Sequence, residues 1–422
     1  MIAFMDEKAY RPMTIQELEA AFCLTDAKDF RDFVKLINAL EDEGKIVRTR
    51  SNRYGLPEKM NLVRGKLQGH AKGFGFVMPF DETEQDVYVH ASDMKGAMHG
   101  DTVLCRVHKS ASGQRWEGEI VRVIDRANRR VVGTYAAGPH FGFVIPDDRR
   151  LNKDIFVPKE DSMNAKDGDK VVLEIRRFPE GRLSAEGVIV EVLGNKNDPG
   201  VDILSIIRKY GLPESFPEDV MAEAEAVPET IHEQELAGRR DLRNVRMVTI
   251  DGEDAKDLDD AVSVEQLPNG HVKLGVHIAD VSYYVKEGSL LDKEAYNRGC
   301  SVYLVDRVIP MLPPRLSNGI CSLNPQVDRL TLTCEMVIDA EGNIMDHEIF
   351  PSVIRTNERM TYTAVHRILE EQDPELMSRY KELTDDFFLM RDLALSLRAK
   401  RMNRGAIDFN FEESKIFVNT EG

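Results

Sequence analysis

Between residues 61 and 195, short runs of alternating apolar and polar residues are separated by Gly, Asp and Pro, a pattern typical of strands in a small β-barrel. The pattern occurs twice. The first copy contains Gly65-Lys66-Leu67, Gly73–Val77, Asp86–Val89 and Gly100–Val103. Its counterparts follow 67 or 68 residues later as Gly133-Thr134-Tyr135, Phe141–Val144, Asp154–Val157 and Gly168–Val171. We therefore predict two barrel domains built on one plan, over residues 61–128 and 129–195.

Helical periodicity dominates the first 60 residues. Thr14 and Glu17 have the spacing of a capping box at a helix start, and Gly44 stands where a helix would stop. The apolar face before this glycine consists of Phe30, Phe33, Val34, Ile37 and Leu40. A basic, strand-like segment follows at residues 45–50. Helices followed by a basic hairpin predict a winged-helix domain over residues 1–60, although helix pairs of this size are also ordinary packing units.

The pattern changes after the second barrel. Residues 196–243 contain two helix-like stretches, 203–210 and 220–226, separated by prolines, and we predict a linker with short helices. Residues 244–422 mix strand-like and helix-like stretches, which predicts an α/β domain. The strand-like stretches are 248–250, 261–264, 273–278 and 330–337, and the helix-like ones lie around 363–371 and 385–401. The predicted fold class is multidomain α+β.

Acidic side chains crowd the stretch from Val248 to Val264, where six lie within ten positions and Lys256 is the single cation among them. They are Asp251, Glu253, Asp254, Asp257, Asp259 and Asp260. Carboxylates this close repel one another, and their hard oxygen atoms are the ligands that Mg²⁺ and Mn²⁺ prefer. Strand-like flanks would mount the turn on a rigid platform, so we predict a site for divalent cations. A charged surface loop is the alternative, since charge runs are usually solvated.

Composition describes a globular protein whose charge is unevenly distributed. The chain has 422 residues and a formal net charge of −17, which argues against indiscriminate binding to polyanions. Basic stretches at residues 45–72, 122–130 and 149–153 predict a path for a polyanion, with a solvated face as the alternative. Five cysteines without a CxxC pair predict free thiols. Because the sequence has neither an apolar span nor an export signal, we predict a cytoplasmic protein.

Both predicted barrels contain the sequence Phe-Gly-Phe, preceded in the first by Lys72. Residues two apart on a strand face the same way, so Phe74 and Phe76 would present two rings on one surface, and Phe141 and Phe143 another two. Exposed rings of this kind stack on nucleic-acid bases. The alternative is that the rings fill the barrels. Duplication beside basic stretches favours a nucleic-acid-binding surface made of these four rings and Lys72.

The segment Lys72-Gly73-Phe74-Gly75-Phe76-Val77 resembles the first RNA-binding signature of cold-shock-type OB folds, whose usual ligand is single-stranded nucleic acid. The order of the domains and three further motifs resemble the ribonuclease II (RNB) superfamily, and within it the ribonuclease R group. The motifs are Asp251 with Asp257-Leu258-Asp259-Asp260, then His277-Ile278-Ala279-Asp280-Val281, then Ile309-Pro310-Met311-Leu312-Pro313 followed by Leu316-Ser317 and Cys321-Ser322-Leu323. The resemblance spans essentially the whole chain and implies a winged helix, two OB folds and the first part of an RNB-type catalytic domain.

The resemblance also implies a chemistry. The four family aspartates that hold Mg²⁺, or Mn²⁺, and activate water match Asp251, Asp257, Asp259 and Asp260. Tyr303 matches a tyrosine that stacks near the 3′ end of RNA, and Phe409 matches an aromatic residue that clamps the terminal bases. The implied activity is a 3′-to-5′ exoribonuclease that releases nucleoside 5′-monophosphates processively from single-stranded RNA. We expect His277, in an apolar strand, to be a hydrogen-bonded core residue.

Members of this superfamily extend beyond the position of Gly422, through the helical second half of the catalytic domain and a further OB fold. We therefore expect this chain to be a fragment that is weakly active or unstable alone. Two alternatives to an exoribonuclease stay open: an RNA-binding fragment that acts through its OB folds, and an acidic protein that binds divalent cations without a nucleic acid. For the exoribonuclease and for the RNA-binding fragment, the expected partner is single-stranded RNA. The expected state of the chain is a monomer.

Overall fold

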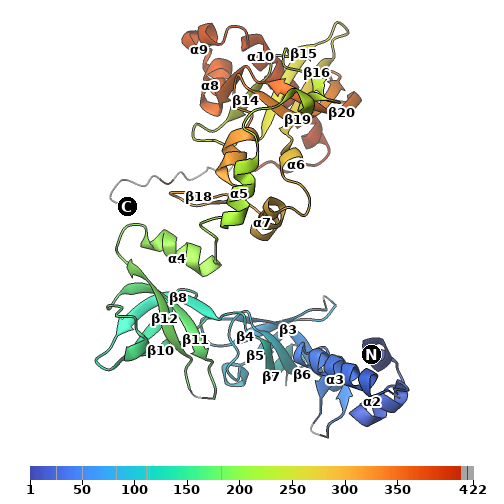
Figure 1. Cartoon of the computed structure of the whole chain (residues 1–422), viewed down its shortest axis with the longest axis vertical. Coiled ribbons are helices and arrows are strands. Elements are labelled where there is room, and N and C mark those ends of the chain that lie inside the picture. Colours follow the sequence, from blue (N-terminus) through green and yellow to red (C-terminus); the bar gives the residue numbers. More distant parts are fainter. Residues whose placement is uncertain are drawn as a thin grey trace. The chain divides into compact units, whose positions relative to one another are not determined.

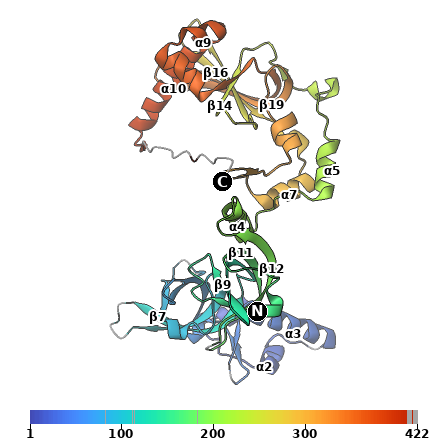
Figure 2. The same cartoon turned by 90° about the vertical axis from the view of Figure 1, so that its left-hand side faces the viewer.

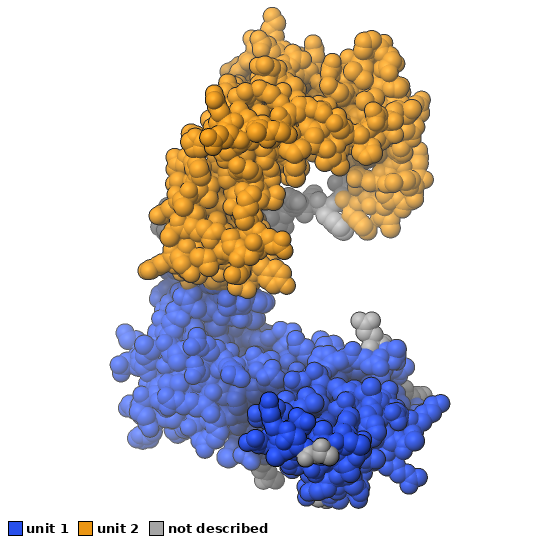
Figure 3. All heavy atoms as spheres, turned by 45° about the vertical axis from the view of Figure 1, so that its right-hand side comes forward, with its two compact units in different colours: residues 1–212, 419–422 blue, residues 213–418 orange. Residues whose placement is uncertain are grey.

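The computed structural model describes residues 1–409 and 416, apart from residues 25, 50, 82, 111, 112, 114 and 182. Residue 50, the last of the predicted basic strand, lies outside this set. The chain divides into two compact units, residues 1–212 and 213–418, which Figure 3 colours blue and orange. Each unit has hydrophobic cores of its own.

The N-terminal part of the first unit consists of three helices and a β-hairpin. These are α1 (Ile2–Asp6), α2 (Ile15–Ala21), α3 (Ala27–Asp42), β1 (Val47–Arg48) and β2 (Tyr54–Gly55). The capping box of Thr14 and Glu17 is confirmed, but it starts only the short helix α2. The longer apolar face belongs to α3, whose start is capped separately by the Asp26 carboxylate. Phe33 and Ile37 of that face are buried together with Leu18.

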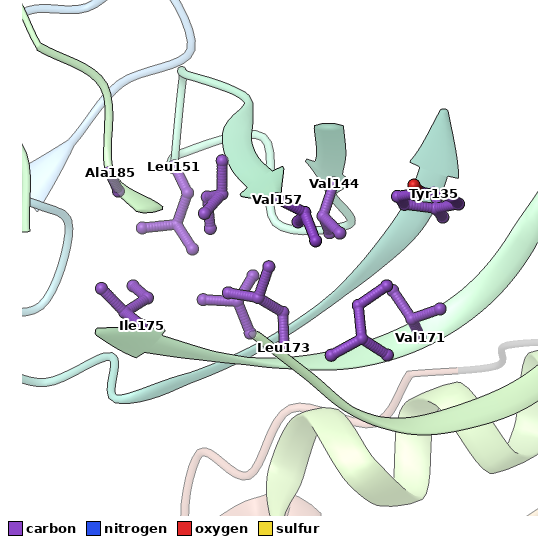
Figure 4. Packing of buried hydrophobic residues seen from close by; sticks show 11 residues of the cluster. Tyr135, Val144, Leu151, Val157, Val171, Leu173, Ile175 and Ala185 are labelled. Carbon is purple, nitrogen blue, oxygen red and sulfur yellow. The ribbon is translucent and has the colours of Figure 1, made fainter. Parts of the chain in front are cut away.

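Two closed five-stranded barrels follow, as the repeat predicts. The first contains β3 (Leu62–Gly69), β4 (Gly75–Pro79), β5 (Val87–Val89), β6 (Thr102–Lys109) and β7 (Trp116–Asp125), in the order β3-β4-β5-β7-β6. The second contains β8 (Arg130–Ala137), β9 (Phe141–Pro146), β10 (Ile155–Pro158), β11 (Asp169–Arg177) and β12 (Glu186–Asn195), in the order β10-β12-β11-β8-β9. Alternate residues point inward, and Figure 4 shows Val144, Val157, Val171 and Leu173 meeting inside the second barrel.

The segment predicted as a linker contributes to both units. Helix α4 (Val201–Tyr210) packs its Val201 and Leu204 side chains on the outside of the second barrel. Helix α5 (Glu218–Ala226) packs against α7 (Leu290–Arg298) in the second unit. Strand β13 (Arg240–Asp241) pairs in parallel with β20 (Ile344–Arg355) at one edge of the sheet of that unit.

The second unit is built on a seven-stranded sheet in the order β13-β20-β19-β16-β15-β14-β21. Its further strands are β14 (Val248–Asp251), β15 (Asp260–Gln266), β16 (Val272–Ala279), β19 (Asp328–Ile338), β20 (Ile344–Arg355) and β21 (Glu358–Thr361). Three helices, α8 (Tyr362–His366), α9 (Pro374–Arg379) and α10 (Thr384–Asn403), lie together at the β14 end of the sheet (Figures 1 and 2). Phe387 of α10 is buried there against Val248 and Met360. The expected α/β arrangement is therefore present.

Smaller elements lie between β16 and β19. They are α6 (Val281–Tyr284), α7 and a two-stranded hairpin of β17 (Val302–Tyr303) and β18 (Val308–Ile309). All five cysteines are free thiols, and Cys105 and Cys321 are buried. Within the described residues, we find no helix that combines the length and the apolar character needed to cross a membrane.

Candidate active site

The acidic stretch forms the turn that joins two neighbouring antiparallel strands, β14 and β15. Asp251 ends the first strand and Asp260 begins the second, so the turn is mounted on the sheet as the sequence predicts. Leu258, in the middle of the acidic sequence, is 1% exposed and belongs to the core of the second unit. Burial of this single apolar side chain pins the turn against the protein, which a solvated loop would not require.

Hydrogen bonds from other strands and loops also hold the turn. The Leu258 amide donates to the Oγ atom of Ser322 at 3.1 Å, and the Leu258 carbonyl accepts from the Leu323 amide at 2.8 Å. The Asp259 carbonyl accepts from the amide of Ala279, at the end of β16, at 3.0 Å. Two motifs singled out in the sequence, around Ala279 and around Ser322, therefore meet the acidic motif in space.

The four aspartates are close enough to influence one another electrostatically. Burial raises the pKa of Asp251 above its ordinary value, the charge of Asp260 adds to the rise, and the Arg359 guanidinium opposes it. Partial burial and the charges of Asp257 and Asp260 likewise raise the pKa of Asp259. A nearby cation would lower the pKa values of both carboxyl groups, because positive charge favours their ionised form.

One atom of the group is unsatisfied. The Oδ2 atom of Asp251 is buried and has no hydrogen-bond partner among the residues that the structure describes. A buried carboxylate oxygen without a donor is costly, and a bound cation would compensate it. The oxygen donors are therefore of the kind that Mg²⁺ takes. Across the described residues, however, no group of three or more His, Cys, Asp or Glu side chains converges tightly enough to hold a metal ion.

Tyr303 lies beside this group. Its hydroxyl group donates to the Oδ2 atom of Asp257 at 2.9 Å, while 67% of the residue is exposed. The hydrogen bond to Asp257, followed by desolvation, raises the pKa of Tyr303. Phe409 follows α10 and is 66% exposed, next to Asp408, whose carboxylate accepts hydrogen bonds from Arg398. The structure thus brings Tyr303 to the aspartates.

The Phe-Gly-Phe rings lie on the outside of both barrels, so the alternative in which they fill the barrels is wrong. The rings of Phe74 and Phe76 are 5.9 Å apart, and those of Phe141 and Phe143 are 5.6 Å apart, between centroids. None of the four belongs to the barrel cores of the described chain. Phe76 is 36% exposed and Phe141 is 44% exposed, so each pair offers an accessible face.

Each ring pair is completed by a third ring that sequence reasoning missed. Tyr88 lies opposite Phe76 on the neighbouring strand, with 5.7 Å between the centroids. Phe156 lies opposite Phe143 in the second barrel, at 5.9 Å. A signal was available, because Tyr88 and Phe156 occupy the same position in the two copies of the repeat.

The basic stretches divide into structural and unpaired residues. Arg126 is bound to the buried Asp101 carboxylate at 2.9 Å, and Arg150 pairs with Asp148. Five more basic side chains of these stretches form ion pairs: Lys45, Arg48, Arg53, Lys59 and Arg130. Among the described residues, the exposed side chains without an ion pair include Lys66, Lys72, Arg129, Arg149 and Lys153. The predicted polyanion path is therefore narrower than the sequence suggests. The Lys72 amide donates a hydrogen bond to the Nδ1 atom of His70. The His70 ring is stacked on Phe74, with 4.3 Å between the ring centroids.

His277 is a core residue, as expected. It is fully buried between Ser263 and Thr333, with its ring nitrogens 3.0 Å and 2.8 Å from their hydroxyl oxygens. Burial lowers its pKa to about 4, so the ring is neutral near pH 7.

Comparisons with known proteins match each part of the chain. Family models for the ribonuclease B OB domain, the cold shock domain and the RNB domain match residues 65–123, 143–217 and 239–422. Ribonuclease R of Thermotoga maritima is 43% identical over 98% of this chain, which spans 58% of that protein. Ribonuclease R of Acidithiobacillus ferrooxidans is 40% identical over 94% of this chain, which covers 90% of it.

The fold has a solved counterpart. The structure of Mycoplasma genitalium RNase R in complex with ribose-methylated single-stranded RNA has a TM-score of 0.76 and 28% sequence identity. The match covers 85% of this chain and 56% of that one. The chain thus spans little more than half the length of several relatives that it matches. These matches extend over the barrels and the acidic turn alike, and the chain belongs to the ribonuclease R family.

Proposed function

We propose that this chain carries the nuclease site of a 3′-to-5′ exoribonuclease that hydrolyses single-stranded RNA processively to nucleoside 5′-monophosphates. One observation carries the proposal: the acidic turn between β14 and β15 is anchored by Leu258 and lies beside Tyr303, in a chain of the ribonuclease R family. A rigid mount is what a hydrolytic site requires, since small misplacements of reacting groups are expensive in rate.

The residues have distinct tasks in this proposal. The carboxylates that would hold Mg²⁺ are Asp251, Asp257, Asp259 and Asp260. When bound, the metal ion would lower the pKa of a water molecule and stabilise charge on the phosphoryl oxygens. Tyr303 would stack its exposed ring on a base near the 3′ end while its hydroxyl group orients Asp257. Phe409 would contact the terminal bases from another side.

The barrels would bind the RNA upstream of the site. Their exposed ring clusters offer stacking surfaces, and stacking on an aromatic ring contributes about 1–3 kcal/mol of binding free energy per base. Lys72 adds positive charge next to the first cluster. The single-stranded RNA in the Mycoplasma genitalium structure supports the same ligand for this chain. We further propose that the helices and hairpin of residues 1–60 form a winged helix, and that the chain acts as a cytoplasmic monomer.

The test uses one RNA strand labelled separately at its 5′ and 3′ ends and incubated with the chain. With Mg²⁺, the proposal expects the 3′ label to leave at once as mononucleotide, while the 5′ label stays on full-length or terminal product. EDTA should stop both changes. Early release of the 5′ label, or fragments of intermediate length from internal cuts, would contradict the proposed direction.

A second candidate function is RNA binding without hydrolysis. It is favoured by the contrast between the two sites: each ring cluster is complete, whereas the described acidic side chains form no three-donor metal site. A gel shift of intact RNA, with no mononucleotide released in Mg²⁺ or Mn²⁺, would favour this candidate over the first.

A further inference from the structure

The positions of Asp257 and Asp259 depend on how the turn between β14 and β15 is held. Residues 252–259 adopt neither helix nor strand, so the regular hydrogen bonds of a sheet do not fix them. Asp251 precedes this segment and Asp257 and Asp259 lie within it. Contacts from outside the turn therefore decide how Asp257 and Asp259 lie relative to Asp251 and Asp260, which belong to the flanking strands.

Arg359 supplies the contacts to the first half of the turn. It lies on β21, which runs parallel to β14 and places Arg359 opposite Thr249. Its Nη2 atom donates to three backbone carbonyls, those of Gly252 at 3.1 Å, Glu253 at 2.7 Å and Ala255 at 2.9 Å. One guanidinium nitrogen therefore forms hydrogen bonds with three backbone carbonyls in the four residues that follow Asp251.

Different residues hold the second half. The Oγ atom of Ser322 donates to the Lys256 carbonyl at 2.9 Å and accepts from the Leu258 amide, and Leu258 itself is buried. The two sets of contacts meet between Ala255 and Lys256. Loss of the arginine would therefore release residues 252–255 while the Leu258 anchor remained.

We propose that Arg359 is a positioning residue, which holds residues 252–255 so that Asp251 and the three aspartates that follow these residues act on one phosphodiester. This inference rests on the proposed nuclease function. Arginine suits the task better than lysine, because its Nη atoms lie one bond further from the backbone than a lysine Nζ and its charge is delocalised over a planar group. A lysine ammonium at the same position would reach only part of the three carbonyls.

The experiment compares Arg359→Ala, Arg359→Lys and the parent chain at full length. The control is Arg355→Ala on β20, since Arg355 binds Asp328 and not the turn. We expect Arg359→Ala to lower kcat for single-stranded RNA at least about tenfold with KM changed less than about twofold. Hydrogen exchange should quicken in peptides that cover residues 252–259 and stay unchanged elsewhere. Arg359→Lys should recover part of both properties.

The outcomes separate a positioning role from a purely structural one. The inference is overturned if Arg359→Ala has the kcat of the parent and the same hydrogen-exchange rates in residues 252–259. It is also overturned by a lower unfolding temperature without any change in kcat. If the alanine variant does not fold, Arg359→Lys decides, and a kcat equal to the parent's overturns the inference. If the parent itself releases no nucleotide, the proposed function fails, and the exchange of residues 252–259 still tests whether Arg359 orders the turn.

Discussion

The hydroxyl group of Tyr303 donates a 2.9 Å hydrogen bond to Asp257, although 46 residues separate them in the chain. The tyrosine reaches the carboxylate from the hairpin β17–β18, which lies outside the main sheet. In the proposed function each residue has its own role, a stacking ring and a metal-holding carboxylate. The structure shows that the two are in contact, so the proposed stacking and the orientation of the carboxylate would be coupled through one side chain.

Tyr303→Phe separates these two roles, because it keeps the ring and removes the hydroxyl group. The hydrogen bond is exposed to solvent, so it contributes less than about 1 kcal/mol to stability, and the unfolding temperature should hardly change. We expect the final product length on single-stranded RNA to stay that of the parent, with kcat lowered at most about threefold. Tyr303→Ala should leave a longer final product. Tyr296→Ala, which removes another exposed tyrosine, serves as control, and an unchanged product length in Tyr303→Ala would contradict the stacking role.

Phe141→Ala tests the outer face of the second barrel. The ring is 44% exposed and contacts Phe143 and Phe156, so its loss should weaken binding to single-stranded RNA by about 1–2 kcal/mol, or roughly five- to thirtyfold in Kd. Ile145→Ala is a matched control, since Ile145 lies on the same strand and is 47% exposed. Affinity should be measured by fluorescence anisotropy in EDTA, and equal affinities of the two variants would count against a stacking surface.

His277 predicts a specific loss of stability in acid. Its pKa is about 4 in the folded protein and about 6.5 in the unfolded chain, so the unfolded state binds more protons between these values. Stability is therefore lost as the pH falls from 6.5 towards 4, by about 3 kcal/mol from this group. His277→Gln should flatten that part of the profile, while the exposed His347→Gln should not. Denaturant unfolding between pH 4 and 7 checks this, and equal slopes in both variants would show that His277 does not titrate as inferred.

Divalent cations should stabilise the chain through the acidic turn. Mg²⁺ or Mn²⁺ should raise the unfolding temperature at pH 7, and less at pH 5, because the raised pKa values of Asp251 and Asp259 let protons compete with the metal ion. Asp251→Asn and Asp259→Asn should remove the effect. Asp254→Asn is the matched control, since Asp254 lies in the same turn but is not one of the four proposed ligands. A cation response that survives in both Asp251→Asn and Asp259→Asn would place the metal elsewhere.

The two barrels were predictable because their strands repeat. Gly73–Val77 and Phe141–Val144 mark equivalent strands, and period-two alternation defines which side faces the core. The same repeat contained Tyr88 and Phe156, but their strands are short, and nothing along the chain shows that they pair opposite a phenylalanine. Cross-strand neighbours become visible only when the register of the barrel is known.

The acidic turn was predictable from the sequence, whereas the contacts that hold it were not. Density of carboxylates singled out six acidic residues between Asp251 and Asp260, and the family resemblance selected four of them. Arg359 is about a hundred residues away in the chain, and a lone arginine on a strand carries no local signal. The split between α2 and α3 was missed for a related reason: the second cap, Asp26, lies in a segment that an uninterrupted helical pattern would also fit.

The central claim, that the acidic turn hydrolyses RNA from its 3′ end, is tested most directly by comparing the parent chain with Asp259→Asn on 3′-labelled single-stranded RNA in Mg²⁺. Both should bind the RNA with similar Kd in a gel shift. The account predicts release of labelled nucleoside 5′-monophosphate by the parent and at least about a hundredfold slower release by the variant. Equal release by both proteins, or none by the parent in either Mg²⁺ or Mn²⁺, would contradict it.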